Sequence, residues 1–267
     1  MMIQRSITWL ALAVIGLTSG CTTLGPMPAT TGASFAPAAR PDVALSAAAV
    51  PGYFLSSSVR QDAKGTPIGQ ASVMVEPDRW IDLPGAVIGG RYVGESDQGG
   101  YPEPMLGYRA YLGDEKRLAL GGLAYGTRAS GENERASYEA WRVGSELGTD
   151  FRITPESHWL ELHVFGSAAL TALSAEGAYC LDAELRYGVD CGEMQVTASA
   201  EAQGFYPSFD AGVGFEVARH LDSVFHGARL DLQIGAGTMP SLVGAEQTSA
   251  RTYASLGGGL SLALGGK

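Results

Sequence analysis

Hydrophobic or small residues alternate with polar and aromatic ones along residues 159–172, WLELHVFGSAALTA. Leu162 and Val164 fall on one face of an extended chain and Glu161 and His163 on the other, because successive side chains of a strand point to opposite faces. These fourteen residues rise about 46 Å at about 3.3 Å each. The pattern predicts a strand long enough to cross a bilayer at a tilt, which takes about 9–11 residues.

The same alternation recurs in seven further stretches. After residues 1–20, no segment shows a sustained period of 3.6 residues or an apolar run that could span a membrane as a helix. On this pattern we expect Leu162, Val213 and Leu232 to face lipid. The stretches are 86–94, 105–112, 118–125, 138–147, 209–217, 229–237 and 253–264.

The predicted fold class is therefore all-β, an antiparallel up-and-down β-barrel of about eight strands over residues 86–267. Residues 51–85 are ambiguous: they could form a periplasmic hairpin leading into the barrel, a plug, or two further strands that would raise the count to ten. Residues 21–50 are rich in Ala, Thr, Ser and Pro and nearly uncharged, so we expect a disordered linker.

The N-terminus has the form of a secretory signal over residues 1–20, with Arg5 before an apolar run at 7–17. The run ends in Leu17-Thr18-Ser19-Gly20-Cys21, which resembles a bacterial lipoprotein cleavage site. The resemblance implies that Cys21 becomes the lipidated mature N-terminus, and Thr22, in place of an aspartate, implies sorting to the outer membrane. The alternative is ordinary signal cleavage that leaves a free cysteine.

The two remaining cysteines, Cys180 and Cys191, are separated by ten residues. The leader directs the chain to an oxidising compartment, where disulfides persist, so we expect these two to be bridged. Metal binding is the rival interpretation, but no histidine lies near the pair in the sequence.

The composition limits the kinds of molecule that we expect the protein to bind. The chain has 37 glycines and 17% charged residues, which suits strands and tight turns, and a net charge of −10 without a Lys/Arg cluster. This argues against nucleic acid, for which phosphate neutralisation supplies much of the affinity. We expect outer-membrane lipid to be the partner, with any extracellular or periplasmic protein partner unidentified, and we expect no cofactor, metal or catalytic residue.

The polar faces of the predicted strands carry a nearly balanced set of charges. Charges leave water at a cost of several kcal/mol each unless they are paired, and the interior of an eight-stranded barrel is only just filled by side chains. We therefore expect these residues to pair inside a plugged lumen. The set is Arg91, Arg109, Arg142, Glu146, Glu161, His163, Asp210, Glu216, Arg229 and Asp231.

Residues 86–264 resemble, in architecture only, the small eight-stranded outer-membrane barrels of the outer-membrane protein A type. The resemblance implies short periplasmic turns and longer extracellular loops, the longest over 175–203, with the lipid-anchored N-terminus in the periplasm. The chain departs from such barrels at its end, where Leu264-Gly265-Gly266-Lys267 stands in place of a terminal aromatic residue.

Two other interpretations use the same alternation. A lipid-tethered soluble barrel of the lipocalin kind would turn the apolar face inward around a small ligand and expose the charges. An enzyme in the outer-membrane barrel would need a pair such as Glu161 and His163 to act on a substrate. The face that carries the charges distinguishes the first of these from the membrane barrel.

Overall fold

A computed structural model describes residues 43–265, except for 57–63, 76, 78–82, 96–98, 114, 134–135, 156–158, 181–196, 219–224 and 240–250. Cys21, Cys191 and the predicted signal lie outside the described residues. No helix in the described ranges is long and apolar enough to cross a membrane.

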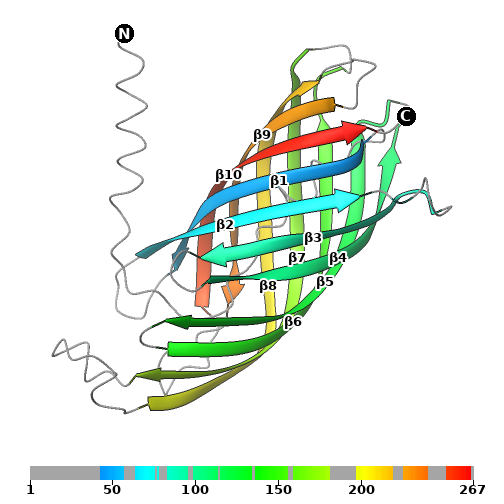
Figure 1. Cartoon of the computed structure of the whole chain (residues 1–267). Helices are drawn as coiled ribbons and strands as arrows, with labels where there is room; N and C mark the ends of the chain where they lie inside the picture. Colours follow the sequence, from blue (N-terminus) through cyan, green and yellow to red (C-terminus); the bar gives the residue numbers. More distant parts are fainter. Residues whose placement is uncertain are drawn as a thin grey trace, which may run out of the picture.

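The described residues form ten strands, each antiparallel to its neighbours, in one closed ring (Figure 1). Consecutive strands pair with each other, and β1 pairs with both β2 and β10, which closes the barrel. The strands are β1 Val43–Ser56, β2 Lys64–Val75, β3 Ala86–Glu95, β4 Gly99–Leu112, β5 Leu118–Asn133, β6 Ala136–Arg152, β7 Glu161–Cys180, β8 Thr197–Ala218, β9 Phe225–Met239 and β10 Arg251–Gly265.

The first two strands correct the predicted boundaries. β1 begins at Val43, inside the stretch expected to be linker. β1 and β2 belong to the barrel wall, which is the third of the alternatives left open for residues 51–85. The strand count is ten, the higher of the two counts that the sequence left open. Residues 43–50, VALSAAAV, are mostly small and carry no charge. Their pattern therefore does not separate a linker from a strand that is held by backbone pairing on both sides.

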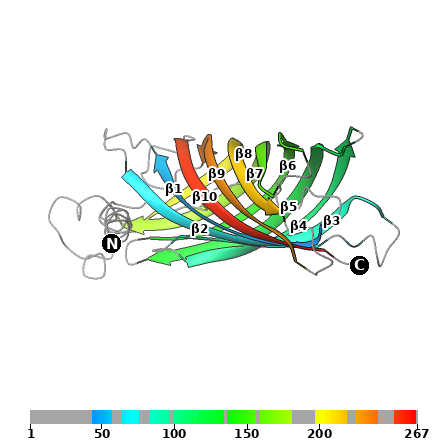
Figure 2. The ribbon, with the colours of Figure 1, turned by 90° about the horizontal axis from the view of Figure 1, so that it is seen from above.

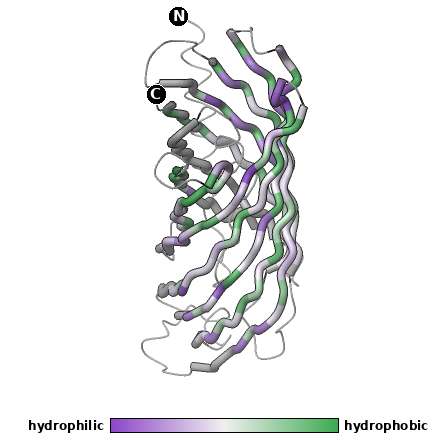
Figure 3. The backbone as a smooth tube through the Cα atoms, turned by 90° about the vertical axis from the view of Figure 1, so that its right-hand side faces the viewer, coloured by the Kyte–Doolittle hydropathy of each residue, from purple (hydrophilic) through white to green (hydrophobic). Residues whose placement is uncertain are grey.

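Wherever their burial is described, side chains alternate between a charged, buried interior and an apolar, exposed exterior, and the hydropathy alternates along the strands accordingly (Figure 3). On β6, Leu147 is 71% exposed whereas its neighbour Glu146 is 1% exposed. Val213 and Leu232 are exposed as expected, and Leu162 is half-buried. This arrangement excludes the lipocalin-like interpretation, which needs the opposite facing.

Aromatic residues stand at both borders of the apolar exterior. We call the end of the barrel that holds the start of β1 and the end of β10 the proximal end, and the opposite end the distal end. On β6, Trp141 lies toward the distal end and Phe151 at the proximal end, and both are exposed. Ten residues at about 3.3 Å, tilted by about 40°, span about 25 Å, the height of the apolar band of outer-membrane barrels.

Further exposed aromatic residues extend these two borders to other strands. Near the distal border they are Tyr92 and Phe205, and near the proximal border Tyr108 and Trp159. Such girdles are typical of barrels that cross a membrane, so the exterior is that of a transmembrane β-barrel.

Four strands, β5 to β8, continue past the distal border (Figure 1). On the distal side, the pairing of β4 with β5 stops at Met105 and Tyr125, and the pairing of β8 with β9 stops at Ser208 and Gly237. Beyond these residues, β5 to β8 pair only among themselves. Their outward faces carry Arg128, Glu139, Glu176 and Glu201, which are exposed and charged. We call this extension the distal sheet.

The distal sheet corrects the predicted loops. Within the stretch expected as the longest loop, 175–203, residues 175–180 belong to β7 and 197–203 to β8, which are paired as far as Cys180 and Thr197. Residues 128–133 are strand as well. The pattern of short turns and long loops is therefore less regular than expected, with only two residues between β5 and β6. Outside lipid, the outward face no longer needs apolar residues, so the alternation that marks the strands fades.

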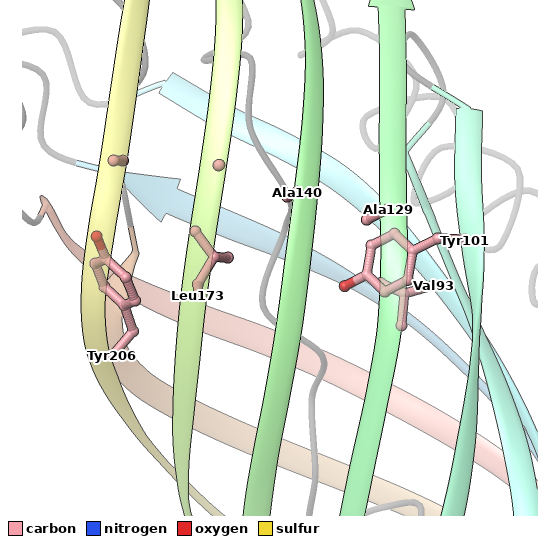
Figure 4. Packing of buried hydrophobic residues seen from close by; sticks show 8 residues of the cluster. Val93, Tyr101, Ala129, Ala140, Leu173 and Tyr206 are labelled. Carbon is pink, nitrogen blue, oxygen red and sulfur yellow. The ribbon is translucent and has the colours of Figure 1, made fainter.

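The interior also holds apolar residues, which pack in two clusters. One lies on the inner face of β3 to β8 toward the distal end and includes Tyr101, Leu173 and Tyr206 (Figure 4). The other lies on β2 to β5 and includes Met74, Met105 and Leu123. Seen from above, the strands curve around this interior (Figure 2). The charged groups thus share the lumen with packed side chains.

Candidate functional site: the charged lumen

All ten residues expected in the lumen are buried. Eight of them fall into two clusters, which we call the arginine cluster and the histidine cluster. The structure adds three buried charges that the sequence pattern did not indicate: Glu103, Asp150 and Arg152.

The arginine cluster joins β3, β4 and β6 through Arg91, Glu103, Arg142 and Glu146. The Glu103 carboxylate accepts from Arg91 and faces Arg142, whose Nε lies 2.9 Å from Glu103 Oε1. Arg91 Nη1 also lies 3.7 Å from Glu146 Oε2. One carboxylate thus bridges two buried guanidinium groups, and Arg91 reaches from β3 to β6.

Two tyrosines complete this cluster. Arg142 donates to the Tyr101 hydroxyl, and the Arg91 guanidinium lies over the Tyr125 ring, 4.5 Å from its centroid. The Tyr125 hydroxyl is 2.7 Å from Thr171 Oγ1 on β7. Because the ring is held at both its face and its hydroxyl, it fixes the position of Arg91 inside the barrel.

Gly144 leaves the space that this ring occupies. It pairs with Tyr125 across β5 and β6, and a Cβ built on Gly144 would come within 2.4 Å of the ring. We expect Gly144→Val to displace the ring and to lower the free energy of unfolding by about 1–3 kcal/mol. Urea titration of the folded barrel would measure this, with Gly258→Ala as the control, since a Cβ there meets nothing closer than 3.5 Å. Equal stability of the two variants would contradict the prediction.

The histidine cluster lies at the proximal end of β6 to β9. Its centre is Asp150, near the end of β6. Asp150 Oδ1 is 2.7 Å from His163 Nδ1, and Arg229 Nη1 donates to Asp150 Oδ2 at 2.8 Å. The members are Asp150, Arg152, Glu161, His163, Glu216, Arg229 and Asp231.

Two further ion pairs surround this centre. Arg229 Nε donates to Asp231 Oδ1 at 2.6 Å, and Arg152 Nη1 lies 3.7 Å from Glu161 Oε1. The Arg229 guanidinium also lies over Phe165, 5.2 Å from the ring centroid. Arg229 therefore links β9 to β6 across two intervening strands.

The other two predicted residues are buried outside these clusters. The Arg109 guanidinium lies 5.7 Å from the centroid of the Tyr111 ring. Asp210 lies against Gly235, where a Cβ would meet its Oδ1. Cys180 is the last residue of β7, and its pairing with Cys191 stays a prediction because Cys191 lies outside the described residues.

Contacts between strands that are not neighbours are the property the two clusters share. Arg91 to Glu146 joins β3 and β6, and Arg229 to Asp150 joins β9 and β6. Such contacts must cross the interior rather than run along the wall. The arrangement presents carboxylates and one imidazole in a buried setting.

Comparison with known proteins adds solved barrels but no relative in sequence. No protein-family model and no curated protein matches the chain. The fold is similar to Neisserial surface protein A (8% identity, 82% of this chain and 96% of that chain, TM-score 0.32) and to the outer-membrane protease OmpT from Escherichia coli (9%, 84% and 96%, 0.47). It is also similar to Ail, the attachment invasion locus protein of Yersinia pestis (10%, 82% and 96%, 0.25).

These identities and TM-scores are too low to support an argument, so the class of the protein is assigned from features of the chain itself. A closed ring satisfies the backbone groups of every strand in lipid, as only helices and closed barrels do. Together with the apolar exterior and its aromatic borders, this identifies the protein as a β-barrel of the outer-membrane type.

Proposed function

We propose that the protein is a lipid-anchored outer-membrane barrel with a plugged lumen and a structural or surface-interaction role. The observation that carries this proposal is the pair of ionic contacts that cross the interior, Arg91 to Glu146 and Arg229 to Asp150. Buried charges that are paired in this way are held in place, because losing one partner leaves the other uncompensated.

The proposed anchor and orientation follow from the leader and the strand order. Lipidation at Cys21 would tether the proximal end, where β1 begins, to the periplasmic side, with residues 22–42 between the anchor and Val43. The distal sheet and its loops would then lie outside the cell. A surface role fits the charged outward face of that sheet, and we propose that the buried His163 serves the plug rather than catalysis.

The plug predicts that the native barrel does not conduct ions. In planar bilayers we expect no steady conductance steps from the purified protein. A variant with Arg91→Ser, Glu146→Ser, Asp150→Ser and Arg229→Ser removes both contacts that cross the interior without changing the net charge, and we expect it to conduct. A shift in gel mobility on heating would establish that each barrel is folded. Steady conductance by the native protein, equal to that of the variant, would contradict the plug.

The anchor has a separate test. We expect cell fractionation to recover the protein with the outer membrane, and mass spectrometry to find a diacylglycerol and a further acyl chain on Cys21. Cys21→Ser should abolish both modifications while leaving the heat-shifted barrel intact. An unmodified Cys21 in the native protein would mean that the protein is an ordinary secreted barrel and not a lipoprotein. The proposed plug would be unaffected by that result.

A further inference from the structure

Three atoms of the kinds that bind metals converge within the histidine cluster. They belong to Glu161, His163 and Glu216, and all lie within 4.8 Å of one another. All three residues are buried. The group brings together an imidazole nitrogen and two carboxylates.

The strand register brings the three residues together. Glu161 and His163 are two positions apart on β7, so they share its inward face. Glu216 on β8 is directly opposite Glu161 in the register. The donor atoms are therefore held by paired backbone rather than by a loop.

Asp150 orients the imidazole. A carboxylate accepts hydrogen bonds, so His163 Nδ1 donates to Asp150 Oδ1 over their 2.7 Å contact. Asp150 is itself fixed by Arg229. Metal-binding histidines typically donate their second nitrogen to a carboxylate in this way, which turns the other nitrogen toward the ion.

His163 Nε2 faces the two glutamates without a hydrogen bond. It lies 3.6 Å from Glu161 Oε2 and 3.5 Å from Glu216 Oε2, and it has no hydrogen-bond partner among the described residues. Both distances exceed the roughly 2.7–3.2 Å of an N–H···O bond. They are close to the edge of about 3.3 Å that joins two ligands of a tetrahedral ion with bonds of about 2.0–2.1 Å.

We propose that His163 Nε2, Glu161 Oε2 and Glu216 Oε2 bind a divalent first-row transition metal of the zinc class. One nitrogen and two carboxylate oxygens form a donor set that such an ion accepts, with water in the remaining position. The other oxygen of Glu161, Oε1, faces Arg152. The ion would join β7 to β8 at the proximal end, and this inference stands whether or not the lumen conducts.

Binding of zinc to the full-length protein in detergent tests the proposal. After treatment with a chelator, equilibrium dialysis against Zn²⁺ with elemental analysis should find one ion per chain. Glu216→Gln should weaken binding by at least about 100-fold, because it removes a ligand, and Asp150→Asn by about 10–100-fold through the orientation of His163. Glu216→His should retain binding, since imidazole is also a zinc ligand. Glu146→Gln, a buried change in the arginine cluster, is the matched control and should bind as the native protein does.

Three results would overturn the proposal. The first is no bound ion in the native protein, which would leave a proton on Nε2 facing the two glutamates. The second is equal binding by the native protein and by Glu216→Gln. The third is a sulfur-to-metal charge-transfer band with Co²⁺ in place of Zn²⁺, which would assign the ion to cysteines. A heat-dependent gel shift for every variant separates loss of the site from loss of the fold.

Discussion

Replacing Glu103 with glutamine is expected to lower the free energy of unfolding by about 3–5 kcal/mol. The Glu103 carboxylate bridges Arg91 and Arg142, whose side chains are almost wholly buried. Without its charge, Glu146 at 3.7 Å from Arg91 is the nearest remaining anion described for the pair. The penalty comes from two buried guanidinium groups that lose the carboxylate they share.

Reversible unfolding in urea, followed by tryptophan fluorescence in lipid vesicles, would measure the loss. The matched control is Glu139→Gln, which breaks a Glu–Arg contact of the same chemistry on the exposed face, where Arg128 and Glu139 side chains are 56% and 65% exposed. We expect that control to cost about 0–1 kcal/mol. Similar losses for both variants would mean that the interior is as well hydrated as the surface.

Replacing Leu147 with arginine is expected to cost about 2–4 kcal/mol. Leu147 lies on the outward face of β6 between Trp141 and Phe151, and it is among the most exposed apolar residues. Near the midplane of a bilayer, an arginine must leave water or distort the lipid around it. The same urea titration in vesicles would measure the difference.

The control for this prediction is Glu176→Arg in the distal sheet. Glu176 also faces outward and is exposed, but it lies beyond the distal aromatic border and opposite Glu139 on β6. An arginine there stays in water and gains an acidic neighbour, so we expect little change. If Leu147→Arg were as stable as Glu176→Arg, the exterior of β6 would not lie in lipid.

The facing of most residues could be predicted from the sequence, because period-two alternation is a local property. Arg91, Arg142 and Arg229 were placed on the inward face from their own strands alone, and all are buried. The alternation could not predict which charged residues these arginines contact. The contact of Arg229 with Asp150 joins residues 79 positions apart, and it depends on how the ring closes.

Glu103 was missed because prolines flank it. The run Tyr101-Pro102-Glu103-Pro104 indicates a loop, since proline cannot donate to a strand ladder and is confined to edges. In the structure this part of β4 pairs with β3 but not with β5, whose pairing begins at Met105. The prolines therefore lie on a local edge, and the strand begins at Gly99.

Asp150 and Arg152 were missed for a similar reason. Residues 149–157 contain a proline and several polar residues, which are typical of a turn, yet β6 extends to Arg152. Glu216, the third residue of the proposed metal site, was placed on the inward face from the alternation along its own strand. Its position opposite Glu161 follows from the register of β7 and β8. Register between distant strands is a property of the whole barrel.

The distance between the two aromatic borders determines the bilayer thickness that matches this barrel. A wall about 25 Å high between Trp141 and Phe151 is shorter than the roughly 30 Å hydrocarbon core of an average bilayer. The bacterial outer membrane is thinner than average, so it accepts the wall without deformation. In synthetic vesicles, short acyl chains would match the barrel, and longer ones would have to compress around it, at a cost of a fraction of a kcal/mol per ångström.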